Sequence, residues 1–345
     1  MVNIDVQQDL NTEITISVKA LKLVALIVCI LSGMAISAEE SVAALSQNTP
    51  VMDAEDSKRL GLTFENITLE VEGLKRDYVF LWIADLHVIA EDLGEVAPDD
   101  LETVLARREK AFRNPQSKMT SLQIWQELVP CVNQSRADAV LFGGDICDFG
   151  SLSNIQVIKN GLAQLQKAFL YARADHDIAP WWLAERKTDE VNALEHSIDG
   201  NEPIQVLEAE DLLVVSFNVS TSNLPEDGLR RFKQLYAKGK PILLITHVPF
   251  HSLVDPSLGE KSASRDGQKR NLTWRKGCYY SPNATTQDFL DLVCANDSPV
   301  FAVLAGHLHF SWHGQLTKRT SQHLFEPSYR GNIGVISIKR KTTQP

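Results

Sequence analysis

Aspartate and histidine recur in this sequence directly after short apolar runs. The runs VFLWIA, AVLF and FLYA lead into ADLHV, GGDICD and RADHD, and the runs ILLIT and VFAVLA lead into HVPF and GHLHF. The polar residues concerned are Asp85, His87, Asp145, Asp148, Asp175, His176, Asp177, His247, His307 and His309. Imidazole and carboxylate groups without thiolates are the donor set that suits Zn, Fe, Mn or Ni. The pattern therefore predicts a metal site.

Each of these segments also has an ordinary structural interpretation. An Asp-x-His at a strand end can cap or turn the chain, a lone histidine can be a hydrogen-bonded core residue, and GGD suits a tight turn. Five such segments together are harder to explain in this way, and they hold five of the nine histidines of the chain. In an extended chain both ends of Asp-x-His or His-x-His point to the same side.

The apolar runs predict the elements that would bring these side chains together. Their continuous hydrophobicity is typical of strands covered on both faces, and amphipathic helical stripes lie between them, for example over residues 122–132 and 155–169. Alternating helices and buried strands predict an α/β domain. Because the carboxyl ends of such strands line one crevice, side chains distant in sequence should meet there.

The number of donors predicts more than one ion. A tetrahedral zinc takes about four ligands, whereas seven donors follow the strands: Asp85, His87, Asp145, Asp175, His247, His307 and His309. Two ions about 3.5 to 4 Å apart would use them.

The blocks DLH, GGDICD, ADHD, THVP and GHLH, in this order, resemble the calcineurin-like metallophosphoesterase family, in particular its secreted or membrane-linked bacterial members. The resemblance covers about residues 66–340. It implies an α/β fold, a four-layer α/β/β/α sandwich of two mixed β-sheets. It also implies an enzyme that hydrolyses a phosphoester, monoester or diester, through two divalent or mixed-valence metal ions, Mn, Fe, Zn or Ni.

The same resemblance implies a role for each site residue. One ion would be held by Asp85, His87 and His309, the other by Asp175, His247 and His307, and Asp145 would bridge them. A hydroxide bridging the ions would attack phosphorus, and His176 would donate a proton to the leaving oxygen. Asp148 would hold the His176 imidazole and favour its charged form.

Position 175 departs from the family pattern Gly-Asn-His-Asp, because Asp175 stands where the family has Asn. A carboxylate can bind a metal, but it cannot donate a hydrogen bond to phosphate unless it is protonated. Two divalent ions, three carboxylates and one hydroxide also sum to zero formal charge. Two interpretations follow: an active hydrolase with altered metal preference or substrate charge, or a catalytically impaired envelope protein that binds metal or phosphate.

The N-terminus predicts export. Residues 1–38 have the apolar run and small residues of a signal peptide, and the alternative is a membrane anchor over residues 20–36. We expect a periplasmic or secreted protein, possible membrane association through this segment, a linker over 39–60, and a phosphoesterase domain over 61–345. Within the domain, the polar residues 251–286 predict a loop insertion, whose Arg265, Arg270, Trp274, Arg275 and Tyr279 are either substrate contacts or solvated loop residues.

Charge and cysteine content restrict the partners. The formal net charge of −10 argues against specific nucleic-acid binding. Export would leave Cys131, Cys147, Cys278 and Cys294, an even number that is compatible with disulfides or with buried thiols. The sequence does not identify the phosphoester substrate or the oligomeric state.

Overall fold

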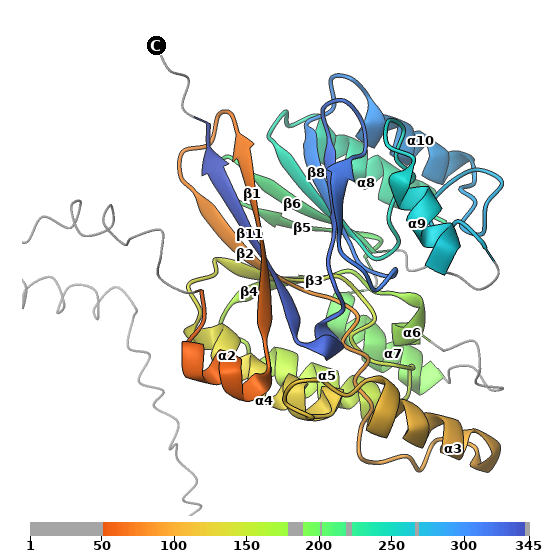
Figure 1. Cartoon of the computed structure of the whole chain (residues 1–345). Helices are drawn as coiled ribbons and strands as arrows, with labels where there is room; N and C mark the ends of the chain where they lie inside the picture. The colour runs from red at the N-terminus through yellow and green to blue at the C-terminus, as the bar shows by residue number, and fades with distance from the viewer. Residues whose placement is uncertain (1–50, 179–188, 201, 219–222, 266–268, 342–345) are drawn as a thin grey trace, which may run out of the picture. The chain divides into compact units, whose positions relative to one another are not determined.

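The computed structural model describes residues 51–178, 189–200, 202–218, 223–265 and 269–341 (Figure 1). All of them belong to Pro50–Pro345, the second of two units into which the chain divides. The predicted signal peptide or anchor, residues 1–38, lies outside the described residues. Among the helices that are described, none combines the length and the apolar character needed to cross a membrane.

The first β-sheet has five strands in the order β1-β11-β2-β3-β4. Their bounds are Thr63–Val71 for β1, Asn332–Arg340 for β11, Tyr78–Ile83 for β2, Ala139–Phe142 for β3 and Ala168–Tyr171 for β4. Strand β11 pairs parallel to β1 and antiparallel to β2, whereas β2, β3 and β4 are parallel to one another. The sheet is therefore mixed, and the last strand of the chain lies beside the first.

The second sheet has six strands in the order β5-β6-β7-β8-β10-β9. Their bounds are Ile204–Glu208 for β5, Leu213–Phe217 for β6, Ile242–Thr246 for β7, Val300–Ala305 for β8, Ser321–Leu324 for β10 and Trp312–Gln315 for β9. The four inner strands are parallel, and the edge strands β5 and β9 are antiparallel to their neighbours.

Side chains that alternate along the strands build three cores. From β2, Phe80 and Trp82 face a core between the two sheets, and Leu81 and Ile83 face helices on the outer side of the first sheet. Those helices are α4 (Ser121–Gln134), α5 (Leu152–Gln164) and α7 (Asp189–Asp199), while α8 (Glu226–Tyr236) and α10 (Ala284–Cys294) cover the outer side of the second sheet (Figure 1). The predicted four-layer α/β/β/α sandwich is confirmed. Each fully buried Leu or Ile stabilises such a core by about 1.5–3 kcal/mol.

The predicted linker over residues 39–60 is wrong for its last part. Helix α2 (Ala54–Leu60) begins where Asp53 accepts the backbone N–H groups of Glu55 and Asp56, at 2.8 and 3.2 Å. It ends at Gly61, whose φ of 64° is left-handed. Leu60 is fully buried in the core under the first sheet. Two helical turns with a single buried position are too short to show an apolar period, so the sequence pattern missed this helix.

The predicted loop insertion over residues 251–286 contains regular structure. Helix α9 (Ser257–Arg265) lies in it, and the side chains of Trp274 and Tyr280 are buried, with 2% and 5% of the residue surface exposed. The aromatic residues pack into the second sheet's outer core. Only part of this segment is therefore loop, because its aromatic residues supply apolar surface that its polar composition hides.

Two further segments position the site. Helix α3 (Pro98–Ala106) continues into a π-helix, Arg107–Ala111, in the long connection between β2 and α4. A four-residue helix, α6 (Asp175–Ile178), follows β4, and a 3-10 turn, Ser328–Arg330, precedes β11. The four cysteines are free thiols, so of the two alternatives left by the sequence the structure has no disulfide among Cys131, Cys147, Cys278 and Cys294.

Candidate metal centre

The segments after strands β2, β3, β4, β7 and β8 meet, as the sequence predicts. Backbone hydrogen bonds join neighbouring segments: the Asp85 N–H donates to the Gly144 carbonyl at 2.9 Å, and the Gly306 N–H donates to the His247 carbonyl at 3.0 Å. A bond of 3.0 Å from the His307 N–H to the Asp85 carboxylate joins the first sheet to the second. Six of the seven predicted metal ligands thus lie on loops, and Asp175 begins helix α6; hydrogen bonds fix these segments to one another.

Five of these ligands have left-handed backbone conformations. The φ angles are 53° for Asp85, 51° for His87, 51° for Asp145, 71° for His307 and 51° for His309. This region costs an L-residue roughly 1–2 kcal/mol, and such residues concentrate at functional sites. The conformation turns the chain sharply at the strand end.

The second glycine of the GGD segment, Gly144, is required by the close approach of the chain to His247. Its φ is 90°, and a Cβ atom there would lie 2.8 Å from the His247 Nδ1 atom and 2.7 Å from the Ala172 carbonyl oxygen. Only glycine permits this approach of the chain to the imidazole.

The first cluster consists of four residues whose ligand atoms lie within 4.8 Å of one another, Asp85, His87, Asp145 and His309. The His309 Nε2 atom is 3.2 Å from the Asp85 Oδ1 atom and 3.2 Å from the His87 Nε2 atom. The side chains of Asp85, His87 and Asp145 are at most 3% exposed, and that of His309 is 23% exposed. The cluster is buried and opens on the His309 side.

The second cluster consists of Asp175, His247 and His307, again with ligand atoms within 4.8 Å of one another. The His247 Nε2 atom lies 3.7 Å from the Asp175 Oδ1 atom and 3.3 Å from the Asp145 Oδ2 atom. Asp145 therefore faces both clusters. The His247 Nδ1 atom bonds to the Gly143 carbonyl at 2.8 Å, which fixes Nε2 as the atom aimed at the cluster.

Unpartnered atoms test whether the second cluster fits a cation. Ten buried side-chain atoms have no hydrogen-bond partner among the described residues, and three of them are Asp175 Oδ1, His247 Nε2 and His307 Nε2. These three belong to the three residues of the second cluster, one atom from each. Unpaired buried polar atoms are costly, and atoms of this chemistry that converge on one point suit a transition-metal ion. The donor set thus fits the metal that the sequence predicts.

Electrostatics couples the two clusters through Asp145. Burial would raise the pKa of the Asp145 carboxyl, but the imidazoles of His247 and His176 hold it well below its usual value. Burial would lower the pKa of His247, and Asp145 raises it to about 10. Burial together with the neighbouring His247 lowers the pKa of His307 to about 4. A neutral imidazole at His307 is the form that binds metal.

Asp148 orders a network that the sequence revealed only in part. Its carboxylate accepts two hydrogen bonds of 2.7 Å from the Arg107 guanidinium and lies 3.0 Å from the His87 Nδ1 atom. Burial would raise the pKa of Asp148, but the bonds from Arg107 and the two histidines hold it far below the ordinary value. Arg107 was missed, because it lies in the π-helix and no local pattern distinguishes it from neighbouring Arg108. The need of a buried carboxylate for a cation was the available signal.

His176 lies at the open side of the centre. Its Nδ1 atom bonds to the backbone carbonyl of Asp148 at 2.8 Å and lies 3.3 Å from the Asp148 carboxylate. The side chain is 16% exposed. Burial would lower the pKa of His176, but Asp145 and Asp148 raise it to about 10. The predicted contact between Asp148 and His176 is therefore present, with the backbone as the nearer partner.

Asp177, the third ionisable residue of the RADHD segment, ties the loops together. Its carboxylate accepts 3.0 Å hydrogen bonds from the backbone N–H groups of Asp145, Cys147 and Ala174, and from the Tyr171 hydroxyl. Burial and the nearby Asp145 raise the pKa of Asp177 to about 6. Asp177 thus holds two ligand-bearing loops in register.

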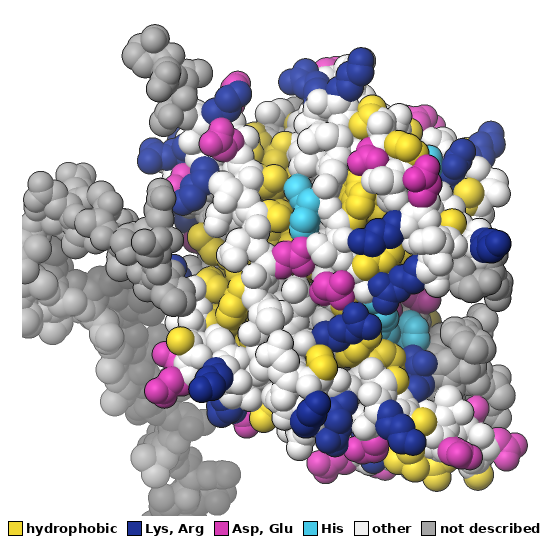
Figure 2. Space-filling model, viewed as in Figure 1, with side chains coloured by type: hydrophobic (Ala, Val, Ile, Leu, Met, Phe, Trp, Pro, Cys, Tyr) yellow, Lys and Arg dark blue, Asp and Glu magenta, His cyan; other side chains and the backbone are white. Residues whose placement is uncertain are grey.

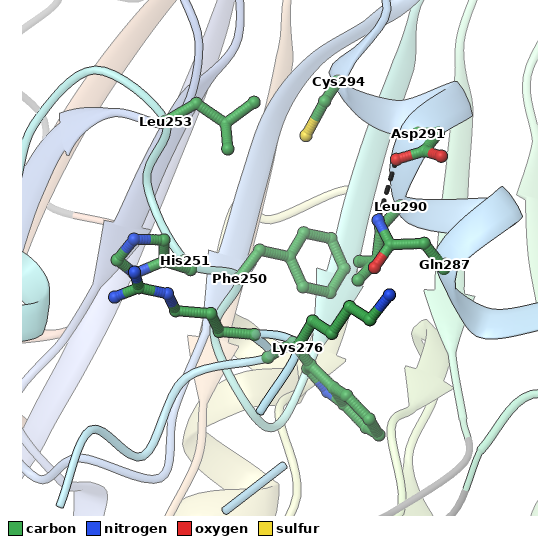
Figure 3. Close-up of a pocket in the computed structure, with 10 residues that line it drawn as sticks. Phe250, His251, Leu253, Lys276, Gln287, Leu290, Asp291 and Cys294 are labelled. Carbon is green, nitrogen blue, oxygen red and sulfur yellow. Dashed lines mark hydrogen bonds between the residues drawn. The ribbon is translucent and has the colours of Figure 1, made fainter. Parts of the chain in front are cut away.

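The residues of the insertion divide between two places. Tyr280 packs beside the second cluster, with its ring 5.2 Å from that of His307. Trp274, Arg275 and His251 instead line a separate cavity of about 140 Å³ between the insertion and α10 (Figure 3). None of the residues that line this cavity belongs to either cluster. Of the other histidines outside the motifs, His313 and His323 form a separate pair, with their Nδ1 atoms 3.1 Å apart.

The fold, with two groups of potential metal ligands at its strand ends, is that of a metallophosphoesterase. Residues 78–311 match the sequence model of the calcineurin-like phosphoesterase family, and the chain belongs to this family. Membership implies metal-dependent hydrolysis of phosphoesters at a dinuclear centre. Among curated proteins, none gives a significant match.

Two of the solved structures that match this chain are phosphatases by name, and both likenesses are distant. A dimetal phosphatase from Danio rerio shares 14% identity at a TM-score of 0.44, over 73% of this chain and 88% of that one. A purple acid phosphatase from yellow lupin (Lupinus luteus) seeds shares 10% identity at a TM-score of 0.42, over 76% of this chain and 45% of that one. Family membership rests on the match over residues 78–311, since these likenesses are distant.

Proposed function

We propose that this protein hydrolyses phosphoesters, monoesters or diesters, at a centre where Asp85, His87 and His309 hold one metal ion, Asp175, His247 and His307 hold a second, and Asp145 bridges them. The observation that supports this most is the position of Asp145. Its Oδ2 atom lies 3.9 Å from the His87 Nε2 atom and 3.3 Å from the His247 Nε2 atom, so that one carboxylate faces both clusters. When bound, the two ions would polarise the phosphate and activate the attacking water. Their identity is proposed as Mn, Fe, Zn or Ni.

His176 is the proposed proton donor to the leaving oxygen. The bond from its Nδ1 atom to the Asp148 carbonyl leaves Nε2 as the ring atom that can deliver a proton. Asp148 and Arg107 act through other residues and are positioning residues. The Asp148 carboxylate orients His87 and lies near His176, and Arg107 fixes that carboxylate from the other side.

A catalytically impaired metal- or phosphate-binding protein is the second candidate, and the identity of residue 175 favours it. The Asp175 side chain is 35% exposed, so this carboxylate can face the substrate. An ionised carboxylate repels phosphate and donates no hydrogen bond to it.

Hydrolysis of p-nitrophenyl phosphate by the wild-type chain and by Asp175→Asn distinguishes the two candidates. Each protein is loaded with Mn, Fe, Zn or Ni, and with pairs of them. We expect turnover by the wild type that a chelator abolishes. If the wild type is inert with every metal while Asp175→Asn is active, the second candidate holds. Asp189→Asn, the same change at the exposed start of α7, is the matched control.

We also propose that the chain is exported, on the basis of residues 1–38. The purified exported form should begin near residue 39 if the segment is a cleaved signal, and should retain it and partition with membranes if it is an anchor. N-terminal sequencing of the protein from the cell envelope and from the medium tests both.

A further inference from the structure

The insertion carries positive charge in a chain that is otherwise acidic. Residues 251–286 hold six Lys and Arg against three Asp and Glu, a balance of +3, whereas the whole chain has −10 and the remainder therefore −13. The six are Lys261, Arg265, Lys269, Arg270, Arg275 and Lys276. In Figure 2, Lys and Arg side chains gather around visible histidine side chains in the part of this face where Figure 1 draws α6 and α9.

Arg265, at the end of α9, lies against the first cluster. Its guanidinium donates to the backbone carbonyl of His309 and lies 5.6 Å from the centre of the Phe310 ring. One turn earlier, Lys261 donates to the Ser311 carbonyl at 2.8 Å. Arg265 stays exposed, and a guanidinium has five N–H donors, of which the bond to His309 uses one. A cation with spare donors is thus fixed beside the exposed ligand of the first cluster.

Arg270 lies on the side of the second cluster. Its guanidinium is 4.7 Å from the centre of the Tyr279 ring, and the Tyr279 ring meets that of Tyr280 edge-on at 4.9 Å. Tyr280 in turn contacts His307, with ring centres 5.2 Å apart. A short chain of aromatic contacts therefore connects Arg270 to the second cluster.

The negative charge of a third carboxylate, Asp175, creates a need for cations near the centre. The two clusters contain three carboxylates, those of Asp85, Asp145 and Asp175, which reduces the attraction of the centre for an anion. Guanidinium groups bind phosphate and carboxylate through paired hydrogen bonds. Arg265 at the first cluster, and Arg270 separated from the second by the two tyrosine rings, would add positive charge on the insertion side of the centre.

We propose that Arg265 and Arg270 form an anion subsite beside the metal centre, which binds a second anionic group, phosphate or carboxylate, on the same substrate. This inference rests on the proposed function, since the first group is the phosphate to be hydrolysed. It makes compact phosphoesters with two anionic groups the preferred substrate class.

Three matched substrates test the subsite: propyl phosphate, 1,3-propanediol bisphosphate and 3-phosphooxypropanoate. The full-length metal-loaded protein should prefer one of the two compounds with a second anionic group over propyl phosphate by about tenfold or more in kcat/KM per scissile phosphate. The preferred compound then identifies phosphate or carboxylate as the ligand. In Arg265→Gln and Arg270→Gln this preference should shrink, because kcat/KM falls more for the compound with the second anionic group. At position 265, glutamine keeps an N–H donor for the His309 carbonyl but removes the charge and the paired donors of the guanidinium.

Arg275→Gln and Lys276→Gln are the controls, because these two residues carry the same charge in the same insertion but line the separate cavity (Figure 3). We expect both variants to keep the wild-type preference. Equal kcat/KM for the three substrates, or an equal loss of preference in the control variants, would overturn the subsite. Circular dichroism and bound metal, measured for every variant, identify a folding defect.

Binding gives a readout that needs no turnover. Titration calorimetry with propylphosphonate and with 1,3-propanediphosphonate compares one and two anionic groups on the same carbon chain. Tighter binding of the diphosphonate by about tenfold, reduced in Arg265→Gln and Arg270→Gln, supports the subsite even in a protein that does not hydrolyse p-nitrophenyl phosphate. Equal affinities would reject the subsite, and an inactive protein that still distinguishes the two ligands would reject the proposed function alone.

Discussion

The two clusters of potential metal ligands contain similar residue types but differ in how the protein supports them. In the first cluster, His87 bonds to Asp148 on one side and contacts His309 on the other, and Asp85 accepts from the His307 backbone. In the second, the three converging atoms of Asp175, His247 and His307 have no hydrogen-bond partner among the described residues. The first cluster is held by hydrogen bonds of the chain itself, whereas the second relies on the ion pair between His247 and Asp145 at 3.3 Å and has more donor atoms left for a ligand. Metal binding should therefore stabilise the two clusters unequally.

The largest effect should come from Asp145→Asn, which alters the one carboxylate that faces both clusters. We expect a loss of hydrolysis of about a thousandfold or more, because the several kcal/mol of transition-state stabilisation supplied by metal ions depends on the bridge. Initial rates with p-nitrophenyl phosphate and metal content by mass spectrometry measure it. Near wild-type rates with both ions bound would show that the clusters act separately.

His309 and His307, one from each cluster, allow a matched test of how the chain supports the two clusters. The test uses the metal-free protein. His309→Ala should lower the free energy of unfolding by about 1–3 kcal/mol, because it removes the side-chain partner of the buried Asp85 carboxylate and leaves only the bond from the His307 backbone. His307→Ala should leave it within about 1 kcal/mol of wild type or raise it, because it removes an atom with no partner. Urea unfolding in the presence of a chelator measures both.

When metal is added, the variant at His307 should be affected more than the variant at His309. Since the unpartnered atoms belong to the second cluster, His307→Ala should lose more of the metal-dependent rise in Tm than His309→Ala does. Equal responses of the two variants, with and without metal, would remove the distinction between the clusters.

A smaller effect is expected from Arg107→Lys, which affects the support of the first cluster. Lysine cannot reproduce the paired hydrogen bonds to Asp148, so kcat should fall about tenfold, in line with the loss of one charged hydrogen bond. The pH–rate profile should also shift, because Arg107 holds the pKa of Asp148 low. Arg108→Lys, a change of the adjacent residue, is the control. A lower kcat with an unchanged pH profile would mean that Arg107 is only structural.

The smallest effect concerns a buried imidazole that belongs to neither cluster. Burial and the neighbouring His313 lower the pKa of His323 to about 4. The unfolded chain, with an ordinary histidine pKa near 6.5, binds the proton first, so this residue should destabilise the fold as the pH falls from about 6.5 towards 4.

Between pH 7 and pH 5.5 we expect this cost to be about 1 kcal/mol. Wild type and His323→Gln, both metal-free, should therefore differ in their pH dependence of unfolding by that amount. Parallel curves for the two proteins would show that the pH dependence comes from the clusters alone.

Much of the site could be predicted because its signals are local. A buried strand is visible as a run such as ILLIT, and the polar residue that ends it, such as His247, stands next to it in sequence. Parallel pairing then brings together the ends of β2, β3 and β4 in one sheet and of β7 and β8 in the other. The packing of the two sheets, which joins these two groups, has no such local signal. The four-layer arrangement, in contrast, was implied by the family resemblance and not by the apolar pattern.

The features that were missed depend on contacts between distant residues. Arg107 is identified only by its bond to Asp148, 41 residues away, and α2 only by the burial of Leu60. The left-handed conformations of the ligands also left no mark in the pattern, since Asp and His occur in many backbone conformations.

Those left-handed ligand positions limit how the protein can evolve or be redesigned. A replacement at Asp85, His87 or His309 has to supply a donor atom and also tolerate a positive φ. Asparagine meets both conditions, whereas valine, isoleucine and threonine are penalised by their branched Cβ before metal chemistry is considered. Mutational drift that keeps metal binding at these positions should thus run towards asparagine. Glycine keeps only the backbone conformation, so a library built on these two residues would keep more folded members than a random one.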